Sequence, residues 1–125
     1  MSGSASGVLV VFLCFLFSGC AGSLQNGQAS WYGGQYHGRK TASGEIYNKR
    51  SFTAAHRTLA FGTVVRVTHK KTGRFVVVRI NDRGPFGKKS RIVDLSEAAA
   101  EKLGILRAGV AAVSIEVLQN TEPVR

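Results

Sequence analysis

Three carboxylic acids in this 125-residue sequence stand beside predicted loops or strand ends, where a side chain can reach a ligand: Glu45, Asp82 and Asp94. An apolar, β-branched run (75–80) is followed by Asn81 and then by Asp82, which comes shortly before Gly84-Pro85. An acid at the end of a rigid strand, followed by residues that fix the backbone, is well placed to be presented to a ligand. The same pattern also suits an ordinary turn, because Asp and Asn are common turn residues.

The remaining ionisable candidates have weaker patterns. Glu45 follows Gly44, in a tight turn that either aims the carboxylate into a groove or leaves it in solvent. His56 ends the small-residue segment 53–56, and a lone histidine is more often a hydrogen-bonded structural residue than a catalytic one. The three histidines, at 37, 56 and 69, fit no local metal-ligand spacing. We therefore predict no metal, and the absence of a phosphate-binding or dinucleotide motif predicts no cofactor.

Short strands must position these side chains. Apolar or alternating runs predict strands at 29–32, 63–69, 74–80, 91–93 and 112–118, with Gly73 closing a hairpin. Ser96 is a predicted N-cap for a helix over 97–103 that ends at Gly104. The pattern is mainly β, with one or two short helices, and predicts a small closed barrel of about six strands.

The loop at 33–44 contains four glycines together with aromatic and basic side chains, which is typical of a binding rim. Trp31 and Tyr32 are adjacent on a predicted strand, so their side chains face opposite ways. One of them is expected in the core, and the other is expected to offer a stacking surface.

The N-terminal segment predicts export. Residues 8–17 are apolar, too few to span a bilayer but sufficient for a signal peptide, which we place at 1–20. Ser18 and Gly19 precede Cys20 as in a bacterial lipobox, which predicts a lipid on Cys20 and a membrane anchor in the cell envelope. An ordinary secretory signal is the alternative. The expected linker is 21–28, the domain 29–118 and the tail 119–125.

The net charge limits the classes of binding partner that are expected. The chain has 17 Lys and Arg against seven acidic residues, a net charge of +10, and every basic residue follows position 38. An excess of this size favours an anionic partner, such as nucleic acid, membrane headgroups or an acidic cell-wall polymer. No cysteine follows Cys20, so the domain has no internal disulfide and depends on its core. We expect a monomer.

Several motifs, in order, resemble the rare lipoprotein A family and its double-psi β-barrel domain, which is related in fold to expansins. The resemblance covers residues 29 to about 118. It rests on these segments: Ala29-Ser30-Trp31-Tyr32, His37-Gly38-Arg39, Thr41-Ala42-Ser43-Gly44-Glu45, Thr53-Ala54-Ala55-His56, Phe61-Gly62-Thr63, Val78-Arg79-Ile80-Asn81-Asp82-Arg83-Gly84-Pro85 and Arg91-Ile92-Val93-Asp94-Leu95-Ser96.

The resemblance implies a six-stranded double-psi barrel with a groove for peptidoglycan glycan and lytic transglycosylase (lyase) activity. The family's proposed active-site positions fall on Asp82, the expected general acid and base, and on Glu45 and His56. Substrate-binding positions are expected at Trp31, Tyr32, Tyr36, His37, Arg39, Asn48, Arg83 and Asp94. Asn48 departs from the family pattern, which often has an aspartate there, so any charge at that position is lost.

One carboxyl group suffices for this reaction. The sugar's own 6-hydroxyl attacks the anomeric carbon, and a single acid first protonates the leaving oxygen and then accepts the hydroxyl proton. A second interpretation is an expansin-like module that binds and loosens glycan without cleaving it. A third, a basic nucleic-acid-binding barrel, conflicts with the export signal, so we predict no nucleic-acid partner.

Overall fold

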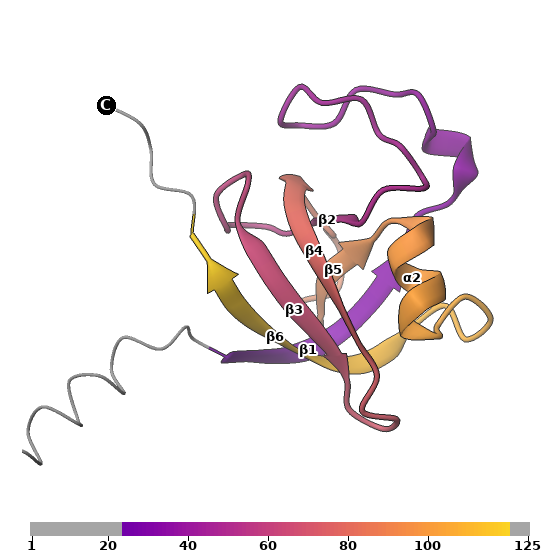
Figure 1. Ribbon diagram of the computed structural model, residues 1–125, viewed down its shortest axis with the longest axis vertical. Coiled ribbons are helices and arrows are strands. Elements are labelled where there is room, and N and C mark those ends of the chain that lie inside the picture. Colours follow the sequence, from indigo (N-terminus) through magenta and orange to yellow (C-terminus); the bar gives the residue numbers. More distant parts are fainter. Residues whose placement is uncertain (1–23, 121–125) are drawn as a thin grey trace, which may run out of the picture.

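The apolar runs of the sequence become the strands of a closed, six-stranded β-barrel (Figure 1). The computed structural model describes residues 24–120. The elements are, in chain order, β1 (Leu24–Trp31), the 3-10 helix η1 (Gly34–Tyr36), β2 (Thr53–Ala55), β3 (Val64–His69), β4 (Phe75–Asp82), β5 (Arg91–Leu95), α2 (Glu97–Leu103) and β6 (Ala111–Gln119). The predicted mainly β barrel with short helices is confirmed.

The strands follow the order β1-β5-β2-β4-β3-β6 around the barrel. The pairs β1/β5 and β2/β4 are parallel, whereas the other neighbours are antiparallel. The short strand β2 therefore lies between β4 and β5, which the sequence connects by a loop. This order brings the ends of β4 and β5 to the same region of the barrel.

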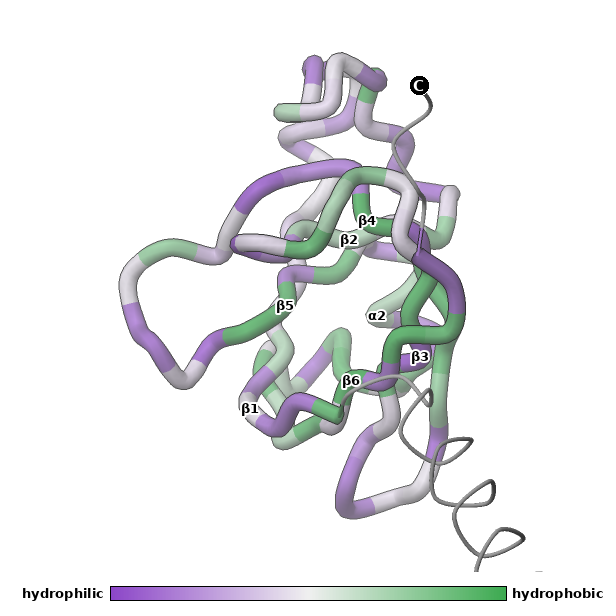
Figure 2. Tube along the Cα trace, turned by 90° about the vertical axis from the view of Figure 1, so that its left-hand side faces the viewer, coloured by the Kyte–Doolittle hydropathy of each residue, from purple (hydrophilic) through white to green (hydrophobic). Residues whose placement is uncertain are grey.

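Alternation of apolar side chains fills the barrel. On β4, Val76, Val78 and Ile80 are buried, whereas Phe75 before them and Val77 between them are exposed. This is the period of two that a strand imposes on its side chains. Full burial of each such side chain is worth about 1.5–3 kcal/mol. Hydrophobic stretches accordingly follow the strands, and many loop residues are hydrophilic (Figure 2).

The helix α2 has the predicted ends. Ser96 Oγ accepts the Ala99 N–H at 3.2 Å, and Gly104 ends the helix with a left-handed φ of 87°. The same Ser96 hydroxyl donates to the Ser51 carbonyl at 2.6 Å. Ser96 thus fixes the helix start to the long connection between β1 and β2, which rises beside α2 in Figure 1. The predicted hairpin between β3 and β4 also forms, with Gly73 at a φ of 79°.

Two elements differ from the sequence prediction. The first strand begins at Leu24 rather than residue 29, and residues 24–28 pair with β6 instead of forming linker. Backbone pairing in this stretch does not depend on its largely exposed polar side chains, so the sequence carried no apolar signal. The strand β2 was not predicted, because its three residues are all buried and show no alternation.

The predicted signal peptide with Cys20, and residues 121–125 of the predicted tail, lie outside the described residues. Within residues 24–120, none of the helices has the length and apolar character needed to cross a lipid bilayer.

Candidate active site

The strand order places four residues from four neighbouring strands in one row. Ser30 on β1 pairs with Asp94 on β5, and Ala55 on β2 pairs with Asp94 on one side and with Asp82 on β4 on the other. At about 4.8 Å per strand, the Cα atoms of the two aspartates lie roughly 10 Å apart. All four residues line a cleft of about 660 Å³. That volume is typical of a small-molecule site.

Asp82 is held by main-chain donors. Its Oδ1 accepts the N–H groups of Ala42 and Arg83, both at 2.9 Å. The Arg83 guanidinium turns elsewhere: it donates to the His56 carbonyl at 3.1 Å and lies 4.0 Å from the centre of the Phe61 ring. Among residues 24–120 no ion pair involves Asp82. The carboxylate is therefore fixed in direction, and its Oδ2 has no hydrogen bond to these residues.

Asp94, the second acid of the row, is half-buried. Ser30 Oγ donates to its Oδ1 at 3.0 Å. Burial raises the pKa of Asp94 and the negative charge of Asp82 adds to the effect, against the opposing hydrogen bond from Ser30 and the charge of Arg91. Burial also raises the pKa of the neighbouring Tyr32, and the negative charges of Asp82, Tyr47 and Asp94 raise it further. The cleft thus offers a neutral phenol and an aspartate that keeps its proton to a higher pH than usual.

Aromatic and basic side chains surround these acids. The cleft is lined by the predicted binding residues Trp31, Tyr32, Tyr36, Arg39, Arg83 and Asp94. It also includes residues that were not predicted as binding positions, among them Lys40, Phe86 and Arg91. Phe86 is 76% exposed, which is unusual for a phenylalanine. Its position directly after Gly84-Pro85 was the only sequence signal for it.

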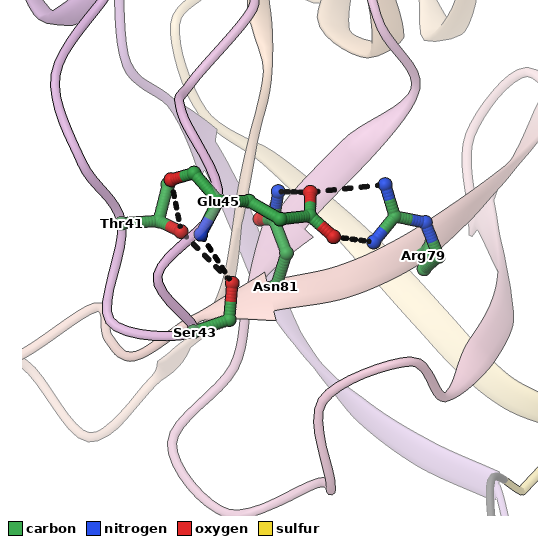
Figure 3. Close-up of polar contacts among 5 residues, drawn as sticks. All are labelled: Thr41, Ser43, Glu45, Arg79 and Asn81. Atoms are coloured by element: carbon green, nitrogen blue, oxygen red, sulfur yellow. Dashed lines mark hydrogen bonds and ion pairs between the residues drawn. The ribbon is translucent and has the colours of Figure 1, made fainter.

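Glu45 does not line the cleft. Its carboxylate accepts hydrogen bonds from both terminal nitrogens of Arg79 and, at 3.0 Å, from the Asn81 amide (Figure 3). The hydrogen bond from Arg79, followed by that from Asn81, lowers the pKa of Glu45. The side chain is 44% exposed. Glu45 is therefore an ionised acid engaged with β4.

His56 is buried and does not line the cleft. Its Nδ1 accepts the N–H groups of Thr58 and Leu59, both at 3.1 Å. The proton of the neutral ring therefore resides on Nε2, which lies 2.9 Å from Gln25 Oε1 and donates to it. Burial, and then the charges of Arg57 and Arg83, lower the pKa of His56. Both ring nitrogens thus have protein partners.

His37 and Asn48, the other two predicted binding residues, also lie outside the cleft lining. Each accepts a main-chain N–H: His37 Nδ1 from Lys49 at 3.1 Å, and Asn48 Oδ1 from Arg50 at 2.9 Å. An amide oxygen is sufficient for the bond that Asn48 makes. Within residues 24–120, no three His, Cys, Asp or Glu side chains gather in a way that could hold a metal ion.

Comparisons with solved structures match the barrel. A Streptomyces papain inhibitor superposes with a TM-score of 0.64 at 23% identity, covering 80% of this chain and 98% of the inhibitor. An expansin of Clavibacter michiganensis gives a TM-score of 0.60 at 23% identity, covering 81% of this chain and 53% of the expansin. At this level of identity the likeness concerns the fold, which is the double-psi β-barrel.

Comparisons of sequence are more specific. A family model described as lytic transglycolase matches residues 24–115. A protein of Neisseria meningitidis named endolytic peptidoglycan transglycosylase RlpA is 58% identical over 92 residues, covering 74% of this chain and 38% of that protein. The protein of that name in Vibrio cholerae is 50% identical over 104 residues, covering 83% and 39%. This chain thus spans less than two-fifths of the length of either relative. The chain belongs to the RlpA family.

Proposed function

We propose that the protein is a peptidoglycan lytic transglycosylase, which cleaves the bond between N-acetylmuramic acid and N-acetylglucosamine and leaves a 1,6-anhydro end. The observation that carries the proposal is the row of Asp82, Ala55 and Asp94 in the cleft lining. The small Ala55 between the two acids leaves space above the row for a sugar. The names of the relatives from N. meningitidis and V. cholerae support the same reaction.

In this proposal Asp82 is the general acid and base. Its carboxyl group gives a proton to the glycosidic oxygen as the bond from C1 to that oxygen breaks. The 6-hydroxyl of the same muramic acid then attacks C1, and its proton passes back to the Asp82 carboxylate, so no water is consumed. The two main-chain N–H groups on Oδ1 hold the acid in place, and Oδ2 is available to the sugar.

The other groups lining the cleft bind the glycan. Tyr32 is neutral, and Asp94 keeps its proton to a higher pH than an exposed aspartate does, so both are suited to donate hydrogen bonds to sugar oxygens when protonated. Tyr36 and Phe86 offer exposed rings on which the apolar face of a sugar can stack. Arg39, Lys40 and Arg91 attract an anionic polymer.

Incubation with purified sacculi tests the function. We expect soluble muropeptides whose muramic acid ends lack one water relative to hydrolysed ends, as mass spectrometry detects. Ends that retain this water would indicate hydrolysis instead. Binding to sacculi without any release would contradict the proposal and agree with the alternative of an expansin-like module, which the names of the relatives do not favour.

We also propose that the protein acts as a monomer in the cell envelope, anchored to a membrane by a lipid on Cys20. In a host with two membranes this places it in the periplasm at the outer membrane. The supporting observation is the lipobox-like sequence Ser18-Gly19-Cys20. Intact-mass analysis of the protein extracted from membranes is expected to show an N-terminal acylated Cys20, and Cys20→Ser is expected to release the protein from the membrane fraction. An unmodified N-terminus elsewhere in 18–28 would contradict lipidation.

A further inference from the structure

Glu45 makes a dense set of polar contacts although it lies outside the cleft lining. Figure 3 shows its carboxylate between the amide of Asn81 and the guanidinium of Arg79. Arg79 and Asn81 are two positions apart on β4, so their side chains share a face of the strand. The residue that follows them is Asp82. An exposed ion pair contributes little stability on average, so its importance depends on what it connects.

The segment that carries Glu45 is a closed turn. The Glu45 carbonyl accepts both the N–H and the hydroxyl of Thr41, at 2.7 and 2.9 Å. Ser43 Oγ lies 3.0 Å from Thr41 Oγ1 and accepts the Glu45 N–H at 3.3 Å. Gly44 adopts a φ of 96°, which a side chain would disfavour. Residues 41–45 therefore form one unit, and moving Glu45 moves the whole turn.

This turn reaches the proposed catalytic acid through its main chain. The Ala42 N–H donates to Asp82 Oδ1 at 2.9 Å, and the Ser43 N–H donates to the Asn81 carbonyl at 3.3 Å. The turn is thus connected to β4 by two sets of hydrogen bonds, one from its main chain and one to the Glu45 side chain. Main-chain donors hold it to Asn81 and Asp82, and the Glu45 carboxylate holds it to Arg79 and Asn81.

We propose that Glu45, Arg79 and Asn81 form a clasp of positioning residues that keeps the Ala42 N–H against Asp82. The inference rests on the proposed function of Asp82 and assigns Arg79 and Asn81 a part in it. The clasp acts on the reaction without touching the sugar. Misplacement of a catalytic group by about 1 Å can lower a rate by about 100-fold. An ion pair that holds the catalytic group in place can therefore affect the rate strongly without touching the sugar.

The contacts of Glu45 favour positioning over proton transfer. Both of its oxygens accept hydrogen bonds from β4, and the hydrogen bond from Arg79 lowers its pKa. A carboxylate in this state is ionised at neutral pH and is a poor proton donor. Asn81 is almost fully buried beneath the turn, and its Oδ1 has no partner among the described residues.

Exchange of the two charges tests the clasp. Glu45→Arg and Arg79→Glu alone are each expected to lower kcat for release of anhydro-muropeptides by about 10–100-fold, with KM little changed. The double variant restores the ion pair, and Asn81 can then offer its free Oδ1 to the arginine. We expect the double variant to recover most of the lost kcat. A double variant no better than the worse single variant would overturn the proposal.

A conservative variant separates positioning from catalysis. Glu45→Gln keeps an oxygen for Arg79 and Asn81 at weaker, uncharged strength, so we expect a loss of only about threefold. A loss as large as that of Glu45→Arg would overturn the proposal, because it would mean that the carboxylate itself is required. The Arg66–Glu116 pair is a matched control, with side chains 42% exposed against 43% and 44% for Arg79 and Glu45. Arg66→Glu and Glu116→Arg should leave kcat unchanged.

Amide hydrogen exchange tests the clasp independently of activity. The Ala42 N–H is expected to exchange slowly in the parent, faster in each single reversal, and slowly again in the double variant. If exchange at Ala42 is the same in all four proteins, the clasp does not hold this bond and the proposal fails. A parent that releases no anhydro products but shows the expected exchange pattern would refute the proposed function and leave the clasp standing as a structural device.

Discussion

Asp82→Asn is expected to lower kcat for release of anhydro-muropeptides by about 10²–10⁴-fold, the usual contribution of a general acid–base group. Asparagine has nearly the same size, and its Oδ1 can still accept the N–H groups of Ala42 and Arg83. It has no acidic proton to give to the leaving oxygen. The fold and the binding of sacculi should therefore persist while turnover is lost.

Thermal unfolding and co-sedimentation with sacculi provide the measurements for fold and binding. Glu101→Gln is a suitable control, because Glu101 is an exposed acid on α2 that does not line the cleft. It removes one negative charge from the same domain and should leave kcat at the parent value. Release of anhydro products by Asp82→Asn at the parent rate would show that another group carries the proton.

The parts of the fold that local chemistry dictates could be predicted from the sequence. The strand β4 is apolar and β-branched at its buried positions, and Gly73 adopts the left-handed conformation that its hairpin requires. The helix α2 begins at Ser96 and ends at Gly104 as expected, because an N-cap hydroxyl and a C-terminal glycine act within a few residues. Such local signals can be recognised in the sequence without knowing how the strands of the barrel are arranged.

The arrangement of the acids depends on contacts that are distant in the sequence. Asp82 and Asp94 share a cleft because β2 lies between their strands, and this three-residue strand has no alternating pattern of its own. The sequence placed both acids at strand ends but could not predict that Ala55 would pair with each of them. Parallel pairing across a crossover leaves no local mark.

The contacts of His56 and Glu45 could not be predicted from the sequence either. His56 bonds to Gln25, which lies in a stretch that looked like linker, and Glu45 bonds to Arg79, 34 positions away. The motifs of the RlpA family marked both residues without stating what they contact. In the structure, each has protein partners at its polar atoms, which favours supporting roles for both around an acid that lies in the cleft.

The pKa shift of Asp94 makes the stability of the fold depend on pH in the opposite direction from that of a salt-bridged acid. Burial raises its pKa above the ordinary value of 3.8, so the folded protein binds the Asp94 proton more tightly than the unfolded chain does. The stability from this proton is fully present below about pH 4 and is lost as the pH rises through the folded-state pKa. Above that pKa, the ionised, half-buried Asp94 therefore makes the fold less stable than a neutral side chain at this position would.

Asp94→Asn is accordingly expected to raise the unfolding temperature at pH 7 and to leave it unchanged near pH 3, as thermal scans at both pH values would measure. The amide can still accept the Ser30 hydroxyl, and its NH₂ can replace the neutral carboxyl as a donor to the sugar. We expect turnover to stay within about tenfold of the parent, since a net hydrogen bond is worth about 0.5–1.5 kcal/mol. An unfolding temperature that falls at pH 7 would contradict the burial argument.

Asp94→Ala removes the donor altogether and is expected to raise KM for glycan by about 5–100-fold, because a buried sugar oxygen left without its hydrogen-bond partner costs about 1–3 kcal/mol. Initial rates of product release at increasing glycan concentration give KM and kcat separately. With Asp82 as the acid, the two Asp94 variants differ mainly in KM, and both retain a measurable kcat. If Asp94→Asn instead lowers kcat as far as Asp82→Asn does, the proton comes from Asp94. The roles of the two acids on either side of Ala55 would then be exchanged, because the enclosed, protonated carboxyl would be the donor and Asp82 would orient the sugar.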